Sequence, residues 1–158
     1  MATVDLRPAK PDDYDFVFSV HAAAMRRCVE QTYGWDEDWQ AHYLREHFDP
    51  VERQIIRYDG TDVGYISIEE QKTSFFLNSI AILPAYQGLG IGTTLIRRLQ
   101  QKARRKEVPV KLRVLKGNPA RALYERLAFT VTGETDTHYR MKWSSIPEPT
   151  EGSYAQPE

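Results

Sequence analysis

The sequence predicts a mixed α/β fold, of the α+β kind, in which helices flank a largely antiparallel, twisted sheet. Two long amphipathic segments follow a first strand, and three consecutive strand segments then form a meander. A glycine-rich turn joins the last meander strand to another helix, and a further strand follows that helix, which indicates one crossover. The predicted order is β-α-α-β-β-β-α-β-α-β-β, with about seven strands and four helices.

The first third of the chain is predicted to hold one strand and two helices. Residues 3–7 alternate polar and apolar side chains, which is the period of a half-buried strand. Apolar residues then recur at helical spacing from about residue 11 to residue 30, and again over about 36–48. Asp49-Pro50 ends the second helix, because the residue before a proline is disfavoured in helical conformation.

The middle of the chain is predicted to be the meander. Residues 54–58 and 63–69 are strand-like and are joined by residues 59–62, whose Asp-Gly pair favours a hairpin turn. Residues 75–83 are the third strand.

The following segments alternate between helix and strand. Residues 89–106 are predicted to be a helix, and residues 109–115 a strand. Asn118 caps the next short helix, over 120–127, and Pro119 stands at its first position. A terminal hairpin is predicted over residues 129–132 and 138–143. The helix over 89–106 has a stripe expected to be buried (Ile91, Leu95, Ile96, Leu99, Ala103) and a basic face (Arg97, Arg98, Lys102, Arg104, Arg105, Lys106).

One domain is predicted over residues 1–143, because no linker or internal repeat interrupts the pattern. Residues 144–158 hold three of the nine prolines and little that could be buried, so we expect a disordered tail there.

The composition is that of a globular protein, with 41% hydrophobic and 27% charged residues. No apolar run approaches the roughly 18 residues that span a membrane, and the N-terminus has no apolar signal region. The single cysteine, Cys28, excludes an internal disulfide and a cysteine-based zinc site. We therefore expect a cytoplasmic protein with no metal and no membrane association.

Charge is unevenly distributed between the two halves. Residues 1–80 hold 15 acidic and 8 basic side chains, a net charge of −7, whereas residues 81–158 hold 7 acidic and 13 basic side chains, a net charge of +6. A basic half suits a polyanionic ligand, and an acidic half suits a cationic substrate. A chance scatter of surface charges is the alternative.

A glycine-rich turn lies between the third meander strand and the helix that follows it. Gly88, Gly90 and Gly92 alternate there. Glycine lets the backbone approach a ligand, and the free N–H groups at a helix start favour anions, most often phosphate. The spacing is not the Gly-x-Gly-x-x-Gly of a dinucleotide fingerprint, and no lysine follows Gly92 as a P-loop requires.

Two separated motifs resemble those of the GCN5-related N-acetyltransferase (GNAT) superfamily. Gln87-x-x-Gly90-x-Gly92 resembles its acetyl-CoA signature, and residues 114–129 resemble its second block of strand, Asn, short helix, Tyr and Gly-Phe. The order of elements also resembles that of the superfamily over the whole chain except the tail. One departure is Ala128, where the family usually has glycine.

The resemblance implies that the chain binds acetyl-CoA and transfers the acetyl group directly to a primary amine. The sheet would splay after Ile82 to admit the thioester, and an N–H near Ile82 would polarise its carbonyl. Asn118 would contact the cofactor's arm, and Tyr124 would be the general acid for the CoA thiolate. The implied pantetheine contacts are the backbones of Ile80, Ala81 and Ile82. The implied pyrophosphate contacts are the amides of Gln87, Gly88, Leu89, Gly90, Ile91, Gly92 and Thr93.

The general base stays open. Some relatives have a glutamate five residues before the asparagine, but Arg113 stands there and cannot accept a proton. Other candidates are Glu69 or Glu70, a water held by Asn78 or Ser79, Glu30, and the side chains of His21, His42 and His138. A mechanism without a base is also possible if the site captures the neutral fraction of the amine.

The acceptor is unknown from the sequence. Residues 28–39 mix aromatic rings with carboxylates, a pattern that suits a cation, so Tyr33, Trp35 and Glu69 are candidate acceptor-binding residues. Packing of the aromatic rings on the sheet is the alternative. The acceptor could be a small molecule or a peptide. The sequence also leaves open whether acyl groups other than acetyl are transferred and whether the protein forms a homodimer.

Two other functions are consistent with the residues. An acyl-CoA-binding sensor without catalysis is suggested by Arg113 at the base position. Nucleic-acid binding by the basic helix is the other, but such a run is more often a solvated helix face, and it lacks interleaved aromatic residues. We therefore expect no nucleic-acid partner.

Overall fold

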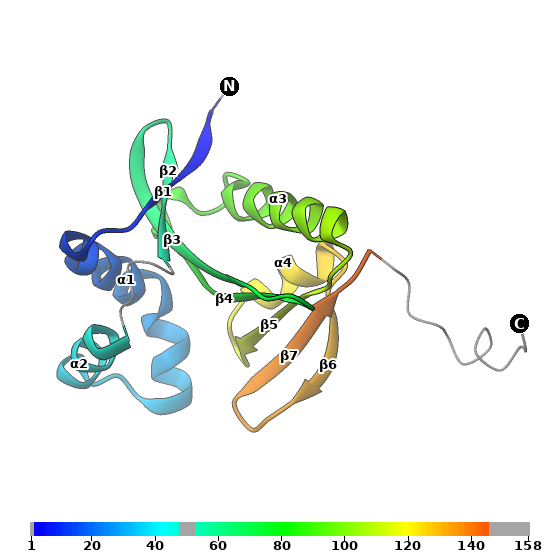
Figure 1. Cartoon of the computed structure of the whole chain (residues 1–158). Helices are drawn as coiled ribbons and strands as arrows, with labels where there is room; N and C mark the ends of the chain where they lie inside the picture. The colour runs from blue at the N-terminus through cyan, green and yellow to red at the C-terminus, as the bar shows by residue number, and fades with distance from the viewer. Residues whose placement is uncertain (1, 48–52, 146–158) are drawn as a thin grey trace, which may run out of the picture.

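A seven-stranded sheet with two helices on each face makes up the fold (Figure 1). The structure is a computed structural model that describes residues 2–47 and 53–145, without the side chains of residues 44–47. The strand order across the sheet is β1-β2-β3-β4-β5-β7-β6. In chain order the elements are β1 (Val4–Pro8), the 3-10 helix η1 (Pro11–Asp13), α1 (Tyr14–Tyr33), α2 (Glu37–His47), β2 (Arg53–Tyr58), β3 (Thr61–Glu70), β4 (Phe75–Ile82), the 3-10 helix η2 (Pro84–Tyr86), α3 (Ile91–Lys106), β5 (Val110–Leu115), α4 (Ala120–Arg126), β6 (Thr130–Glu134) and β7 (His138–Trp143).

Every predicted element is present in the predicted order, and the differences lie at the ends of elements. The β2–β3 hairpin has two turn residues rather than four, because Tyr58 pairs with Thr61 and both Asp59 and Gly60 have positive φ. The predicted helix over 89–106 begins at Ile91 instead, because Gly90 is left-handed. The predicted end of the second helix at Asp49-Pro50 and most of the expected tail lie outside the described residues.

The sheet is antiparallel except between β4 and β5. These two strands run parallel, and they pair only where Phe75–Leu77 lies beside Val110–Leu112. β4 continues beside β3 as far as Ile82, whereas β5 continues beside β7. The two strands therefore separate after Leu77 and Leu112, which opens the sheet in its middle.

The two faces of the sheet have separate cores. On one face α1 packs on the sheet through Val17 and Val20, which meet Tyr65 and Ala81. On the other face the predicted stripe of α3 and Tyr124 of α4 are buried. They pack against the strand side chains that point away from α1, because successive side chains of a strand point to opposite faces. Any opening between β4 and β5 is therefore lined by α1 from one side and by α3 and α4 from the other.

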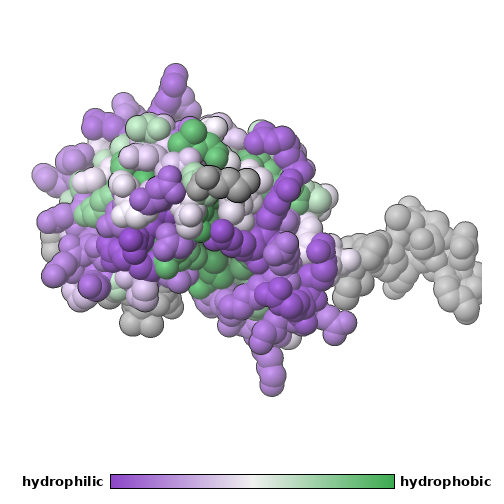
Figure 2. All heavy atoms as spheres, turned by 90° about the horizontal axis from the view of Figure 1, so that it is seen from above, coloured by the Kyte–Doolittle hydropathy of each residue, from purple (hydrophilic) through white to green (hydrophobic). Residues whose placement is uncertain are grey.

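The outer face of α3 is basic and solvated, as its amphipathic pattern predicts. From above α3, the surface is mostly hydrophilic (Figure 2). Some of these cations also contact the sheet: Arg98 donates to the carbonyl of Val4 at 2.7 Å, and Lys102 pairs with Glu70 at 2.5 Å. None of the described helices is both long and apolar enough to cross a membrane.

Candidate active site

A cavity of about 820 Å³ lies where β4 and β5 separate. It is lined from the α1 face and from the α3–α4 face, so it passes through the sheet. Its lining includes Tyr124 and every predicted cofactor residue except Leu89. The residues that line it are Ala24, Met25, Arg27, Cys28, Gln31, Ile80, Ala81, Ile82, Tyr86, Gln87, Gly88, Gly90, Ile91, Gly92, Thr93, Gly117, Asn118, Pro119, Ala120, Leu123, Tyr124 and Arg126.

A run of free main-chain N–H groups forms one end of this cavity. Among the described residues, no N–H from Gly88 to Thr93 donates to a protein acceptor, and the first one that does so in α3 is Thr94, to Gly90 at 3.0 Å. Six consecutive donors at the positive end of a 16-residue helix form a site for a doubly charged phosphate group. The structure thus has free N–H groups where the glycine spacing predicts an anion cradle.

The glycines of this cradle have different physical roles. Gly88 and Gly90 have φ of 79° and 81°, in the left-handed region that favours glycine, and a Cβ on either would meet no protein atom within 4 Å. The left-handed conformation and the open space for a ligand explain why glycine stands at both positions. Gly92 instead lies against α4, because a Cβ there would come within 3.4 Å of the Leu123 side chain.

Gln87 closes the turn rather than extending the cradle. Its N–H donates to the carbonyl of Pro84 at 3.2 Å, and its side chain donates to the carbonyl of Ile82 at 2.9 Å. Of the amides predicted to hold the pyrophosphate, that of Gln87 is therefore used within the turn, and those from Gly88 to Thr93 are free. The same side chain holds the turn against the end of β4.

Strand alternation determines which backbone groups of β4 face the opening. The N–H of Leu83 donates to Val63 on β3, and a Cβ at Gly64 would clash with the carbonyl oxygen of Ala81, so the polar backbone groups of Ala81 also face β3. Those of Ile80 and Ile82 consequently face the gap beside β5. Of the three predicted pantetheine contacts, Ala81 has its backbone engaged in the sheet. Ile80 presents its backbone to the gap, and Ile82 presents its N–H, since its carbonyl accepts from Gln87.

Tyr124 is held in the wall of the cavity by the end of its own helix. The N–H of Phe129 donates to the carbonyl of Tyr124 at 3.0 Å, and that of Ala128 donates to Glu125 at 3.1 Å, which together form a Schellman motif. The ring of Phe129 packs on that of Tyr124 with centroids 5.8 Å apart. Ala128 adopts φ of 71°, so alanine keeps the conformation for which the family's glycine is suited.

The hydroxyl of Tyr124 is a proton donor that the protein leaves unused. The residue is 6% exposed, and its hydroxyl has no hydrogen-bond partner among the described residues. Burial raises the pKa of Tyr124 to about 12, because the phenolate would be poorly solvated. The side chain is therefore a neutral phenol throughout the physiological range.

Asn118 lies in the cavity wall and also caps α4. Its side-chain oxygen accepts from the N–H of Ala120 at 2.9 Å, and the intervening Pro119 already has helical φ and ψ. The side-chain oxygen of Asn118 is thus occupied, and its side-chain NH₂ group stays available to a ligand.

The three predicted acceptor residues do not line the cavity. Tyr33 is 62% exposed at the end of α1. Trp35 packs beside Cys28, Val29 and Leu115, and donates from its ring nitrogen to Glu37 at 2.6 Å. Glu69 accepts from Gln71 and, at 3.5 Å, from Asn78. The ring of Trp35 is thus a packing residue, in line with the alternative interpretation of that segment, whereas the ring of Tyr33 is exposed.

None of the candidate bases lines the cavity either. His21 is mostly buried between α1 and α2, bonded to Gln40 at 3.0 Å, and burial lowers its pKa. The pKa of His138 is also lowered, by burial and by Arg113. Glu30 pairs with Arg26. Among the described residues, those that line the cavity include no aspartate, glutamate or histidine.

One face of α1 lines the cavity, which sequence analysis missed. Ala24, Met25, Cys28 and Gln31 recur at helical spacing and contribute to the cavity, together with Arg27. The spacing of apolar residues in α1 is that of an ordinary amphipathic helix. Only the packing of α1 beside the opening shows that this face lines the cavity. Burial raises the pKa of the Cys28 thiol, so it is not an activated nucleophile.

The described residues contain no group of three or more candidate metal ligands. The residues present do fit coenzyme A. Consecutive free amides suit its pyrophosphate, glycines with open space beside them admit it, and the backbone of Ile80 and the N–H of Ile82 suit an amide-bearing arm.

Comparison with known proteins agrees with this geometry. The sequence model of the acetyltransferase (GNAT) family matches residues 16–129. The N-alpha-acetyltransferase RimI of Mycobacterium tuberculosis is 33% identical over 128 residues, which are 75% of this chain and 80% of that protein. A putative [ribosomal protein bS18]-alanine N-acetyltransferase of Bacillus subtilis is 27% identical over 138 residues, 85% of each chain.

A solved structure shares the fold. The PaiA N-acetyltransferase of Thermoplasma acidophilum, solved in complex with coenzyme A, superposes with a TM-score of 0.73 at 16% identity. The match covers 90% of this chain and 99% of that one.

Proposed function

Because this chain belongs to the acetyltransferase (GNAT) family, and is an N-acetyltransferase that uses acetyl-CoA, we propose that it acetylates the α-amino group of a peptide or protein N-terminus, with Tyr124 as the acid for the leaving thiolate. The observation that carries the proposal is that no carboxylate or imidazole is found among the described residues that line the cavity. The names of the two relatives, an N-alpha-acetyltransferase and a putative bS18-alanine acetyltransferase, support it.

Without a base in the cavity, the amine has to arrive unprotonated. An α-amino group has a pKa of about 7.7–8.0, whereas a lysine side chain has about 10.4. At pH 7.5 roughly a third of α-amino groups but only about 0.1% of lysine side chains are neutral. The ratio between these fractions, about three-hundredfold, favours an N-terminal acceptor over a lysine.

The proposed binding of the cofactor uses main-chain groups. The amides from Gly88 to Thr93 would hold the pyrophosphate, and the backbones of Ile80 and Ile82 the pantetheine arm. Bound acetyl-CoA supplies an acetyl group activated as a thioester. The N–H of Ile82 faces the opening and would donate to the carbonyl oxygen as it gains negative charge.

Tyr124 would act on the sulfur. A phenol with a pKa of about 12 is a weaker acid than a thiol with about 8.5, so complete transfer of its proton is uphill. Tyr124 is thus best suited to stabilise the thiolate by a hydrogen bond, with its proton moving as the attacking amine releases one. The new amide bond forms, the thioester bond breaks, and the proton lost by the amine balances the one gained by the thiol.

The test is a comparison of two peptides that each carry one amine. One has a free N-terminus and no lysine, and the other has a blocked N-terminus and one lysine. Release of free thiol from acetyl-CoA, measured at pH 7.5, should favour the first by about a hundredfold in kcat/KM. Equal rates, or a preference for lysine, would contradict the proposal. Transfer to the α-amine should rise between pH 6.5 and 8.5 with the neutral fraction of the amine.

A further inference from the structure

The face of the sheet on which α1 packs carries arginines that form no ion pair with a described residue. Lys111 and Arg113 of β5 pair across strands with Lys142 and Arg140 of β7, so like charges lie directly opposite each other in two successive rows. Such pairs are destabilising in a sheet. Arg113 and Arg140 are both exposed, and neither has an ion pair among the described residues.

Arg113 stands at the edge of the opening. Pairing of β4 with β5 ends at Leu112, so Arg113 is the first residue of β5 whose backbone has no partner on β4. Leu115, two residues on and on the same face, packs against Cys28, which lines the cavity. The effect of Arg113 on the pKa of His138, which lies opposite Leu115, places its charge on this face.

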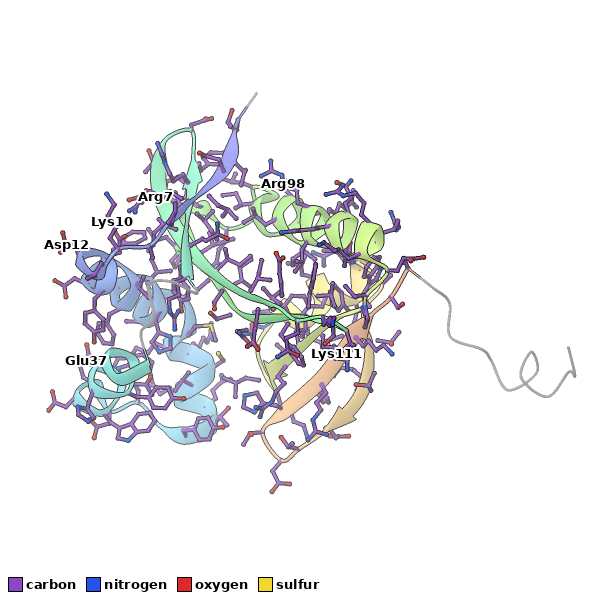
Figure 3. The ribbon with its side chains drawn as sticks, viewed as in Figure 1. Arg7, Lys10, Asp12, Glu37, Arg98 and Lys111 are labelled. Carbon is purple, nitrogen blue, oxygen red and sulfur yellow. The ribbon has the colours of Figure 1, made fainter. Side chains whose placement is uncertain are left out.

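The opposite rim of the opening is also cationic. Arg27 of α1 lines the cavity and has no ion pair among the described residues. Three carboxylates of the surrounding elements have other partners: Glu30 with Arg26, Glu37 with Trp35 and Glu134 with Lys116. Glu69 of β3 accepts from the neutral side chains of Gln71 and Asn78. In the side-chain view, Glu37 of α2 and Lys111 of β5 lie far apart, on opposite sides of the molecule (Figure 3).

The cofactor and the acceptor would use different mouths of the cavity. The free amides lie at the start of α3, on the α3–α4 face, so coenzyme A would fill that side. The amine then reaches the thioester from the α1 face, between Arg27 and Arg113. None of the aromatic or acidic side chains of residues 28–39, which suggested a cationic acceptor, lines this passage.

We infer that the acceptor carries carboxylate groups near its reactive amine, and that Arg113 and Arg140, with Arg27 across the opening, recognise them. This inference rests on the proposed function and specifies its substrate. Arginine favours carboxylates because its planar guanidinium can donate two parallel hydrogen bonds.

The test uses three peptides that differ only in charge: Ala-Asp-Asp, Ala-Asn-Asn and Ala-Lys-Lys, each followed by the same neutral, amidated sequence. Free alanine and alaninamide form a second arm, which separates the side-chain carboxylates of a peptide from the α-carboxylate of an amino acid. We expect kcat/KM for the acidic peptide to exceed that for the neutral one by about tenfold, and the basic peptide to be poorest.

Substitutions assign the preference to residues. Arg113→Gln and Arg140→Gln should each reduce the preference for the acidic peptide to about threefold or less, with little change for the neutral peptide. Arg113→Glu should make the basic peptide the better acceptor. Arg105→Gln removes an exposed cation of α3 on the other face and should leave the preference unchanged. Equal rates for the three peptides, or a preference that survives Arg113→Gln with Arg140→Gln, would overturn the inference.

A binding measurement separates this inference from the proposed function. The anisotropy of the acidic peptide, labelled at its C-terminal end, is measured with the CoA-saturated protein. If no peptide is acetylated but the acidic one still binds more tightly, and Arg113→Gln removes that difference, the proposed function fails and the recognition of carboxylates holds. If all three peptides are acetylated equally, the proposed function holds and this inference fails.

Discussion

The two mouths of the cavity use different parts of the chain. The α3 side presents six consecutive main-chain N–H groups, whereas the α1 side presents side chains, among them Met25, Arg27 and Gln31. Main-chain donors are common to all residues except proline, so the first site depends on conformation. The second depends on which side chains occupy the positions. A substitution that leaves the backbone unchanged should thus affect the two mouths very differently.

Tyr124 lies between the two mouths, and its removal should have the largest effect. Tyr124→Phe deletes the buried donor and should lower kcat by about a hundredfold or more, while the Kd for acetyl-CoA changes less than twofold. Tyr139→Phe is the matched control, since that ring packs on Arg121 of α4 outside the cavity. Single-turnover rates together with calorimetric titration of CoA test this, and normal turnover by the Phe variant would exclude Tyr124 from the chemistry.

The pH dependence of the same variant pair adds a second readout. Because burial raises the pKa of Tyr124 to about 12, the phenol stays protonated, so the wild-type rate should show no fall that is due to this group below about pH 10. A fall centred near pH 9 that disappears in Tyr124→Phe would show that the tyrosine titrates normally.

A pair of substitutions in the cradle should show whether conformation alone matters there. Gly90→Ala places a Cβ on a residue with φ of 81°, at a cost of about 1–2 kcal/mol, so we expect about a tenfold rise in the Kd for acetyl-CoA. Leu89→Ala keeps its N–H and removes an exposed side chain, and should change that Kd less than twofold. A larger loss from Leu89→Ala than from Gly90→Ala would mean that the side chain, not the backbone, binds the cofactor.

Two helix ends offer a smaller test of the same idea. Ala128, after α4, and Glu107, after α3, both have left-handed φ, at 71° and 58°. Ala128→Gly and Glu107→Gly should each stabilise the protein by about 0.5–1 kcal/mol in urea unfolding, because glycine avoids the strain but adds freedom to the unfolded chain. Only Ala128→Gly, which adjoins Tyr124, should alter kcat. Destabilisation by either substitution would contradict the assigned backbone strain.

The smallest expected effect concerns the anchoring of α1. Arg7 donates to both carboxylate oxygens of Asp13 at 2.9 Å and pairs with Asp62, which ties the start of α1 to β1 and β3 (Figure 3). Arg7 lowers the pKa of Asp13, so this stabilisation is present above the unfolded pKa of about 4 and is lost as the pH falls through the lower folded value.

Asp13→Asn should therefore cost about 1 kcal/mol of unfolding free energy at pH 7 and much less at pH 2. Asp12→Asn is the control, since the Asp12 carboxylate makes no ion pair with a described residue. Urea unfolding at the two pH values measures the difference. A cost for Asp13→Asn that is the same at both would contradict the pairing.

The same difference between main-chain groups and side chains explains why one mouth of the cavity could be predicted from the sequence better than the other. The glycines at 88 and 90 and the block from Asn118 to Tyr124 are local patterns, and each predicts a conformation that its own neighbours determine. The choice between Ala81 and its neighbours Ile80 and Ile82 depended on the register with β3, which no local pattern contains. The contribution of α1 to the cavity likewise depended on packing between elements far apart in the chain.

The sequence by itself determined the order of the elements, the anion cradle and the family, because strand and helix periods, glycine conformation and spaced motifs are short-range properties. Only the tertiary structure decided that the cavity passes through the sheet, that no described acid or histidine lines it, and that arginines rather than the Tyr33–Trp39 carboxylates border its second mouth. The physical reason is that a cavity and its charges are made by side chains from separate elements, and the folded packing alone brings these together.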